Sequence, residues 1–226
     1  SYLIWQDDVA RVLVDMGAGS QIGFEKSGAS FDTIEAIAFT QLRPDHSADL
    51  QAYIGAAQSD TREQRLTIMG PTGDGGINPS TRELIERLFG PQGAYPHLAD
   101  AFKPRSSLGY RVRSIDVPAS GSKRWARYQT DHVKMSAIPV HHGDIPALAW
   151  RIEIAGQSIV ITGSFNNSKN LVATFAKDAD ALVVSHAIPE NSRGVLRDLY
   201  ARPSQLGRVA DQADARMMIL GHRNVR

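Results

Sequence analysis

Short apolar runs, separated by glycine, proline and polar turns, recur along the chain and predict strands that alternate with helices. Two runs near the start flank the polar turn at residues 6–8 and predict a hairpin. Apolar residues at helical spacing predict the helices. The predicted strands are 2–5, 10–14, 36–40, 66–69, 112–117, 133–140, 150–154, 158–162 and 181–185, with a last one before His222, and the predicted helices are 21–27, 47–57, 79–89, 171–177 and 204–213.

This order of elements predicts an α/β fold. Hairpins occur in each half, and strands and helices alternate through the second half. The pattern favours a four-layer αββα sandwich, in which two mixed sheets pack face to face with helices outside. The chain has 226 residues, 42% of them hydrophobic, so it can form one domain over 1–226. Because residues 1–5 already have the pattern of a strand, we expect the natural protein to extend beyond both ends.

Composition limits the chemistry and the partners. The chain has no cysteine, so histidine, aspartate and glutamate are the available metal ligands. A formal net charge of +1 gives no bulk attraction to polyanions, and we therefore do not expect nucleic acid among the partners. No apolar run is long enough to span a membrane, and no signal peptide is visible. The compartment is open: cytoplasmic, or periplasmic if an export signal has been removed.

Residues 40–50 are the strongest candidate for a functional segment. A strand-like run leads into Gln41-Leu42-Arg43-Pro44-Asp45-His46, and a helical pattern follows. Ser47 is predicted to be the N-cap of that helix. Asp45 and His46 should therefore lie on a tight loop at the end of a strand, where open α/β sheets place their functional groups.

The chain resembles the metallo-β-lactamase superfamily of hydrolases, in particular the branch with ribonuclease Z and arylsulfatase-like enzymes. The family signature His-x-His-x-Asp-His is similar to Gln41-x-Arg43-x-Asp45-His46. Further matches are the strand that ends in Asp15 and Gly17, the His141-His142-Gly143 run, the strand before Ser164 and the strand before His222. The resemblance spans nearly the whole chain and implies the αββα sandwich.

The resemblance implies a centre of two metal ions, and this chain keeps four of its seven ligand positions. The first ion would be bound at positions 41, 43, 142 and 164. Gln41, Arg43 and Ser164 are degenerate ligand positions, because an arginine cannot coordinate and a serine has no carboxylate to bridge two ions. Asp45, His46 and His222 would remain for the second ion. We expect these ligands, His142 and Ser164 to converge although they are far apart in sequence.

Two alternatives follow for the metal. One zinc, iron or manganese ion binds to Asp45, His46 and His222, or no ion binds and Arg43 neutralises Asp45. His141 and His142 compete for the family's histidine position, and the His-Gly-x-x-Pro run favours His142. His186 could donate a proton, or it is a partly buried histidine without a catalytic role. Asp15 is expected to hold an imidazole or a backbone turn.

Two functions fit these residues. The first is a hydrolase of an ester, lactone, sulfate ester or phosphodiester, in which Asp45, His142 and His186 are catalytic. The alternative is a non-catalytic descendant that binds an anionic small molecule in the former active site. Processing of tRNA is a weaker third idea, because the chain is near neutral. A small molecule is thus the expected partner, no membrane is involved, and a homo-oligomer remains open.

Overall fold

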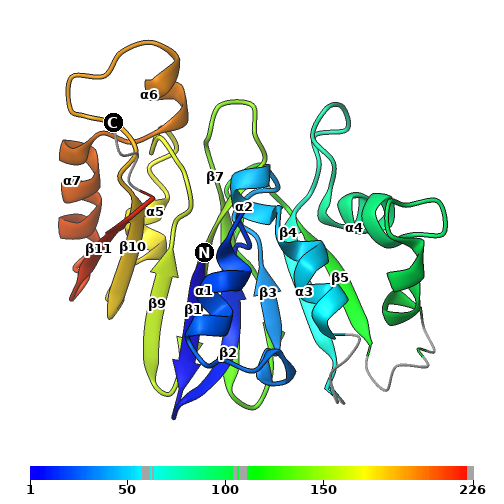
Figure 1. Cartoon of the computed structure of the whole chain (residues 1–226). Helices are drawn as coiled ribbons and strands as arrows, with labels where there is room; N and C mark the ends of the chain where they lie inside the picture. The colour runs from blue at the N-terminus through cyan, green and yellow to red at the C-terminus, as the bar shows by residue number, and fades with distance from the viewer. Residues whose placement is uncertain (58–61, 63, 104–105, 107–110, 223–226) are drawn as a thin grey trace. The chain divides into compact units, whose positions relative to one another are not determined.

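The chain folds around two β-sheets, each in its own compact unit. The computed structural model describes residues 1–57, 62, 64–103, 106 and 111–222. The units are Ser1–Val117 and Pro118–Arg226. Each has one mixed sheet with helices beside it, as Figure 1 shows. This confirms the predicted α/β class with two mixed sheets flanked by helices.

The first unit has a sheet in the order β1-β2-β3-β4-β5. The two first strands form the predicted antiparallel hairpin, and Asp7 and Asp8 in its turn have positive φ. The later strands are parallel, so their carboxyl ends lie at one edge. The elements are β1 (Tyr2–Gln6), β2 (Val9–Val14), α1 (Ser20–Lys26), η1 (Phe31–Thr33), β3 (Ala36–Ala38), α2 (Pro44–Ser47), α3 (Leu50–Ala56), β4 (Leu66–Pro71), α4 (Thr81–Phe89), η3 (Pro96–Phe102) and β5 (Val112–Val117).

An apolar core holds α1 and α3 against this sheet. Phe24 of α1 and Ile54 of α3 are buried in one cluster with Ile37 of β3. Figure 1 shows both helices over the same face of the sheet. Full burial of one such side chain stabilises the fold by about 1.5–3 kcal/mol. The core thus fixes the sheet edge from which the candidate site projects.

The helix expected over 47–57 begins later, and Ser47 is not its N-cap. Pro44 starts the short helix α2 directly after Arg43, because proline suits the first turn of a helix. Ser47 ends that helix, and its hydroxyl donates to the carbonyls of Leu42 and Arg43 at 3.0 and 3.2 Å. Helix α3 then follows Asp49. The Asp49 carboxylate accepts from Ser20 Oγ at 3.2 Å and so ties this region to α1.

The second unit has a sheet in the order β11-β10-β9-β8-β7-β6. Strands β6 to β9 pair antiparallel, and β9, β10 and β11 pair parallel. Strands β7, β9, β10 and β11 therefore run in the same direction and end at one edge. The elements are β6 (Trp125–Gln129), β7 (Val133–Val140), β8 (Ala147–Ile154), β9 (Gln157–Ile161), α5 (Val172–Phe175), β10 (Ala181–Ser185), α6 (Val195–Leu199), α7 (Pro203–Ala213) and β11 (Met218–Gly221).

Two elements of this unit were not predicted. Strand β6 is an edge strand whose residues are exposed or half-buried, so it lacks the alternation that marks a strand with one face in the core. Helix α6 has only five residues and buries none of them, so its sequence is too short to show a clear helical period. None of the helices in the described ranges combines the length and the apolar character needed to cross a lipid bilayer.

Candidate functional site

Asp15 holds the predicted motif loop of the first unit, residues 41–46, in place. The residue is only 3% exposed, and its carboxylate accepts three hydrogen bonds. The donors are the Thr40 amide at 2.7 Å, the Thr40 hydroxyl at 2.8 Å and Nδ1 of His46 at 2.8 Å. The expectation that Asp15 holds an imidazole and a backbone turn is confirmed.

Two backbone bonds close this loop around the imidazole. The Met16 amide donates to the His46 carbonyl at 2.5 Å, and the Asp49 amide donates to the Met16 carbonyl at 2.9 Å. Gly17 has to be glycine, because a Cβ there would lie 2.1 Å from the Asp45 carbonyl oxygen. The loop is therefore packed against the chain that follows β2, and Asp45 and His46 have fixed backbone positions.

His46 is buried, and both of its ring nitrogens have polar neighbours. Nδ1 donates to Asp15, so Nε2 is the nitrogen that could bind a metal ion. Gln41 Nε2 lies 2.8 Å from it and Asp45 Oδ2 lies 3.4 Å from it. Burial lowers the pKa of His46, but the charges of Asp15 and Asp45 and the hydrogen bond to Asp15 outweigh burial and raise it.

The side-chain amide of Gln41 can face this imidazole in either of two orientations. Its Oε1 is buried and has no hydrogen-bond partner among the described residues. An amide flip exchanges the oxygen and the nitrogen without changing the shape of the side chain. In the flipped orientation Oε1 would accept from the Nε2–H group of the His46 imidazolium, which satisfies both groups. In both orientations the Gln41 amide contacts His46 Nε2, the nitrogen that a metal ion would need.

The predicted pair of Arg43 and Asp45 is present. Arg43 Nε lies 3.8 Å from Asp45 Oδ1. The side chains are 54% and 48% exposed, so water screens the pair and it adds little stability.

The ligand types in this unit fit one ion better than two. Two ligands of a tetrahedral zinc ion, each about 2.0–2.1 Å from the metal, lie about 3.3 Å apart. The 3.4 Å between Asp45 Oδ2 and His46 Nε2 matches that spacing. Gln41 would have to withdraw its amide from Nε2, and Arg43 has no lone pair to offer. These two side chains therefore add no nitrogen or carboxylate ligand for a further ion.

In the second unit, His142 is held by a distant carbonyl. Its ring is buried, and Nδ1 donates to the Leu199 carbonyl oxygen at 2.6 Å. This bond places the proton on Nδ1 and leaves the lone pair of the neutral ring on Nε2. The ring also contacts Tyr200 edge to face, with centroids 5.2 Å apart. His141 is only half-buried. The choice of His142 over His141 as the functional residue stays a prediction.

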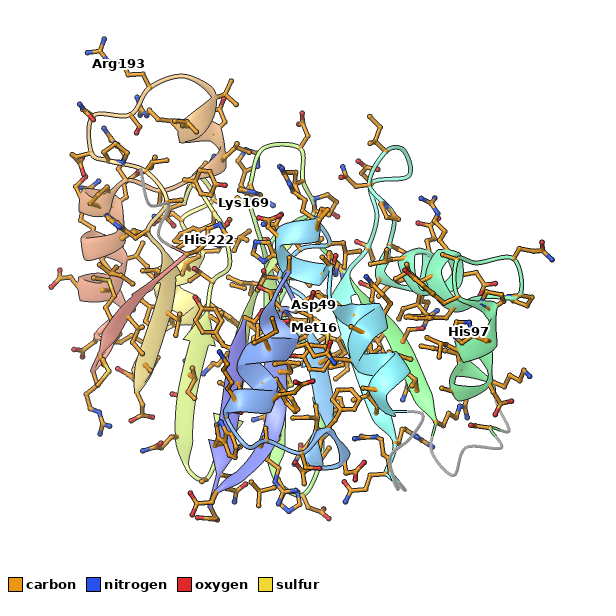
Figure 2. The ribbon with its side chains drawn as sticks, viewed as in Figure 1. Met16, Asp49, His97, Lys169, Arg193 and His222 are labelled. Carbon is orange, nitrogen blue, oxygen red and sulfur yellow. The ribbon has the colours of Figure 1, made fainter. Side chains whose placement is uncertain are left out.

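Three more predicted residues follow strands of this unit at the same edge as His142. Ser164 follows β9, is 1% exposed, and its Oγ has no hydrogen-bond partner in the described ranges. His186 follows β10, and its amide donates to the Gly221 carbonyl at 2.9 Å. His222 follows β11 with a positive φ of 47° and is labelled in Figure 2. The carboxyl edge of the sheet thus carries all four residues.

Each unit therefore gathers its own share of the predicted site. The first brings Gln41, Arg43, Asp45 and His46 together, and the second has His142, Ser164, His186 and His222 at one sheet edge. Convergence of the whole set stays a prediction. Sequence reasoning missed Thr40 and the Leu199 carbonyl. Thr40 adjoins the motif and could have been found, whereas nothing in the sequence marks a backbone carbonyl 57 positions from His142.

The chain is similar to two ribonucleases over most of its length. It is 32% identical to ribonuclease Z of Lachnospira eligens, over 94% of this chain and 78% of that protein. It is 25% identical to ribonuclease Z of Pediococcus pentosaceus, over 95% of this chain and 78% of that protein. No protein-family model matches the chain.

Solved structures have the same fold. The short form of human tRNase Z matches with a TM-score of 0.75 and 16% identity, over 98% of this chain and 84% of that chain. The metallo-β-lactamase fold protein YhfI from Bacillus subtilis matches with a TM-score of 0.72 and 17% identity, over 99% and 78%. The fold implied by the sequence resemblance is confirmed.

The expectation that nucleic acid is not a partner is wrong. The relatives that match almost the whole chain are named as ribonucleases, and a structural relative is named for tRNA. The expectation came from the net charge of +1, which sums over the whole surface. A sum near zero is compatible with cations concentrated on one part of the surface.

Replacing Asp15 with asparagine tests the role of this carboxylate. The pKa of His46 is raised in the folded chain, so its contribution to stability is present below the unfolded pKa of about 6.5 and is lost as pH rises through the folded pKa. Asp15→Asn should remove this loss and lower the free energy of unfolding by about 1–3 kcal/mol below pH 6.5. Urea denaturation between pH 5.5 and 9 measures both effects.

Asp49→Asn is the matched control, because Asp49 also accepts hydrogen bonds in this region but none from a histidine. Its free energy of unfolding should depend on pH between 6.5 and 9 as that of the unsubstituted chain does. An Asp15→Asn variant with the same dependence would show that Asp15 does not set the pKa of His46.

Proposed function

The chain belongs to the ribonuclease Z family of metallo-β-lactamase-fold hydrolases, and from this premise we propose that it hydrolyses phosphodiester bonds in RNA with at most one metal ion. Asp45, His46 and His222 would bind that ion, which is zinc, iron or manganese. The observation that carries the proposal is the arrangement at His46, where Nδ1 is held by Asp15 and Nε2 lies 3.4 Å from an Asp45 oxygen.

Phosphodiesters are the ester class that best fits the proposal. Sulfate esters, lactones and carboxylic esters share the need for a polarised centre, but two relatives that match more than nine-tenths of the chain are named as ribonucleases. The half-exposed guanidinium of Arg43 also suits this class, because arginine binds phosphate oxygens through two parallel hydrogen bonds.

A divalent ion at this site would polarise a phosphoryl oxygen and lower the pKa of a water molecule. The side chains of this protein would supply the rest. His142 has its lone pair on Nε2 in the neutral ring and can accept a proton there, because Leu199 holds Nδ1–H. We assign proton donation to the leaving oxygen to His186, which follows β10. Asp45 would bind the metal and orient the reacting groups.

The degenerate positions explain why we propose one ion and not two. Gln41 and Arg43 stand where the family signature has histidines, and Ser164 stands at the position of a bridging carboxylate. Ser164 Oγ is buried without a hydrogen-bond partner in the described part of the chain, so no hydrogen bond there requires a serine. Arg43 would supply, in part, the positive charge that the first ion contributes in a two-metal site.

A second function is favoured by one contact. The amide of Gln41 lies 2.8 Å from His46 Nε2, at the atom that would bind the metal. If this contact persists in solution, the site stays free of metal and the protein binds an anionic ligand through Arg43 without cleaving it.

Metal content and cleavage together separate the two functions. The chain should contain close to one transition metal per molecule after incubation with zinc or manganese and gel filtration, and Asp45→Ala should lose it. It should then cleave a precursor tRNA transcript that carries a short 3′ trailer, with EDTA as the negative control. Two tightly bound ions per chain would refute the mononuclear site. A metal-free protein that binds the transcript and leaves it intact would support the second function.

Restoring the missing ligands should raise the affinity for zinc. Gln41→His with Arg43→His supplies two imidazoles and removes the amide from His46 Nε2, and Ser164→Asp adds a carboxylate. We expect calorimetry to show at least tenfold tighter binding in the double variant and a further gain in the triple variant, since loss of even a residue that only orients a ligand changes metal affinity by roughly ten- to a hundredfold.

Arg127→His with Gln129→His is the matched control for that series. It adds two histidines at the same spacing on the exposed edge strand β6, so it measures the zinc affinity of a histidine pair alone. A triple variant that binds zinc no better than this control would mean that the chain has lost the geometry of the site together with the ligands.

A further inference from the structure

Residues 187–199, called the α6 segment below, extend from the carboxyl end of β10 and contain the short helix α6 (Figure 1). The segment includes Arg193 and Arg197, both exposed. Figure 2 shows the Arg193 side chain projecting outward from the loop. Gly194 between the segment's first arginine and the helix has φ 61° and ψ −144°, a conformation that only glycine adopts readily. The turn therefore depends on this glycine.

No ion pair links either arginine to a carboxylate within the described ranges, whereas some other exposed cations of this unit are paired. Arg216 pairs with Asp180 at 3.8 Å, and Lys177 pairs with Asp178 at 3.2 Å. The segment also has two acidic residues, Glu190 and Asp198. The Glu190 carboxylate accepts from the amide and hydroxyl of Ser204 at 2.8 and 2.6 Å, and it lies 4.0 Å from Arg202. Asp198 is exposed and offsets one of the two charges.

The inner end of the α6 segment is fixed to the loop that carries His142. The Asp198 carbonyl accepts from the Gly143 amide at 3.0 Å and from Asn166 Nδ2 at 2.7 Å. The Leu199 carbonyl accepts from His142 Nδ1 at 2.6 Å. Gly143 has φ +58°, and a Cβ on it would lie 2.9 Å from Leu199 Cδ2. The segment therefore starts and ends at the sheet edge of the candidate site while its middle projects into solvent.

We propose that the α6 segment is an RNA-binding arm, in which Arg193 and Arg197 contact backbone phosphates of the substrate next to the reacting bond. The proposal rests on the function proposed above in taking RNA as the partner. Two exposed guanidinium groups without a carboxylate partner are available to phosphates at no loss of an existing ion pair. In a chain with a net charge of +1, attraction to RNA has to come from such local cations.

Binding measured without cleavage tests the arm. The probe is a fluorescein-labelled precursor tRNA transcript with a short 3′ trailer, titrated in EDTA by fluorescence anisotropy from 50 to 250 mM KCl. Arg193→Ala with Arg197→Ala should weaken binding about tenfold at 100 mM salt and reduce the slope of log K against log salt by about 1.5, since each phosphate contact contributes about 0.7–0.9. The lysine pair Arg193→Lys with Arg197→Lys should keep most of the slope.

Lys177→Ala with Arg216→Ala is the matched control. It removes the same charge from the same unit at the amino ends of β10 and β11, the opposite edge of the sheet. An unchanged slope in the Arg193 and Arg197 variant, or an equal reduction in this control, would overturn the arm. If the natural chain cleaves RNA but the arm variant keeps its slope, only the arm fails. If the slope depends on the arm but no RNA is cleaved, only the hydrolysis fails. A natural chain that does not bind the transcript refutes both.

Discussion

The carboxylate of Asp15 is the interaction on which the candidate site depends. A buried carboxylate is costly unless its oxygens are satisfied, and here the two oxygens accept from Thr40 and from the imidazole of His46. Those donors belong to the two ends of one loop, so a single buried charge fixes both the exit of β3 and the ring of His46. The imidazole thereby has its Nδ1 committed, and only Nε2 remains for chemistry.

The sequence predicted the parts of this arrangement that depend on periodicity and on neighbouring residues. Asp45 and His46 were expected on a loop after a strand, because apolar residues precede them and a helical pattern follows. Helix α6 and strand β6 could not be predicted in this way, since exposed elements have no core face to mark them. The N-cap assignment to Ser47 failed because Pro44 had already started a helix three residues earlier.

Contacts between distant residues could not be predicted from the sequence. The partner of His142 Nδ1 is a backbone carbonyl, and backbone groups are the same at every position. The contact between Gln41 and His46 is a different case. The family resemblance predicts that glutamine stands at a ligand position, but not that its amide would lie 2.8 Å from the imidazole of His46. Whether a residue at such a position leaves space beside the imidazole or contacts it depends on side-chain geometry. In this chain the Gln41 amide contacts it.

None of the groups that shape the motif loop is itself a candidate metal ligand. Asp15 and Thr40 fix its two ends, Gly17 allows the Asp45 carbonyl to approach, and the Met16 backbone bonds to both His46 and Asp49. The loop therefore keeps its shape without an ion, and the side chains at positions 41 and 43 can change while the backbone around His46 stays in place. Chemistry at this site is set by a few side chains on a scaffold that the rest of the unit stabilises. A change of ligand at these positions should thus alter metal binding far more than it alters folding.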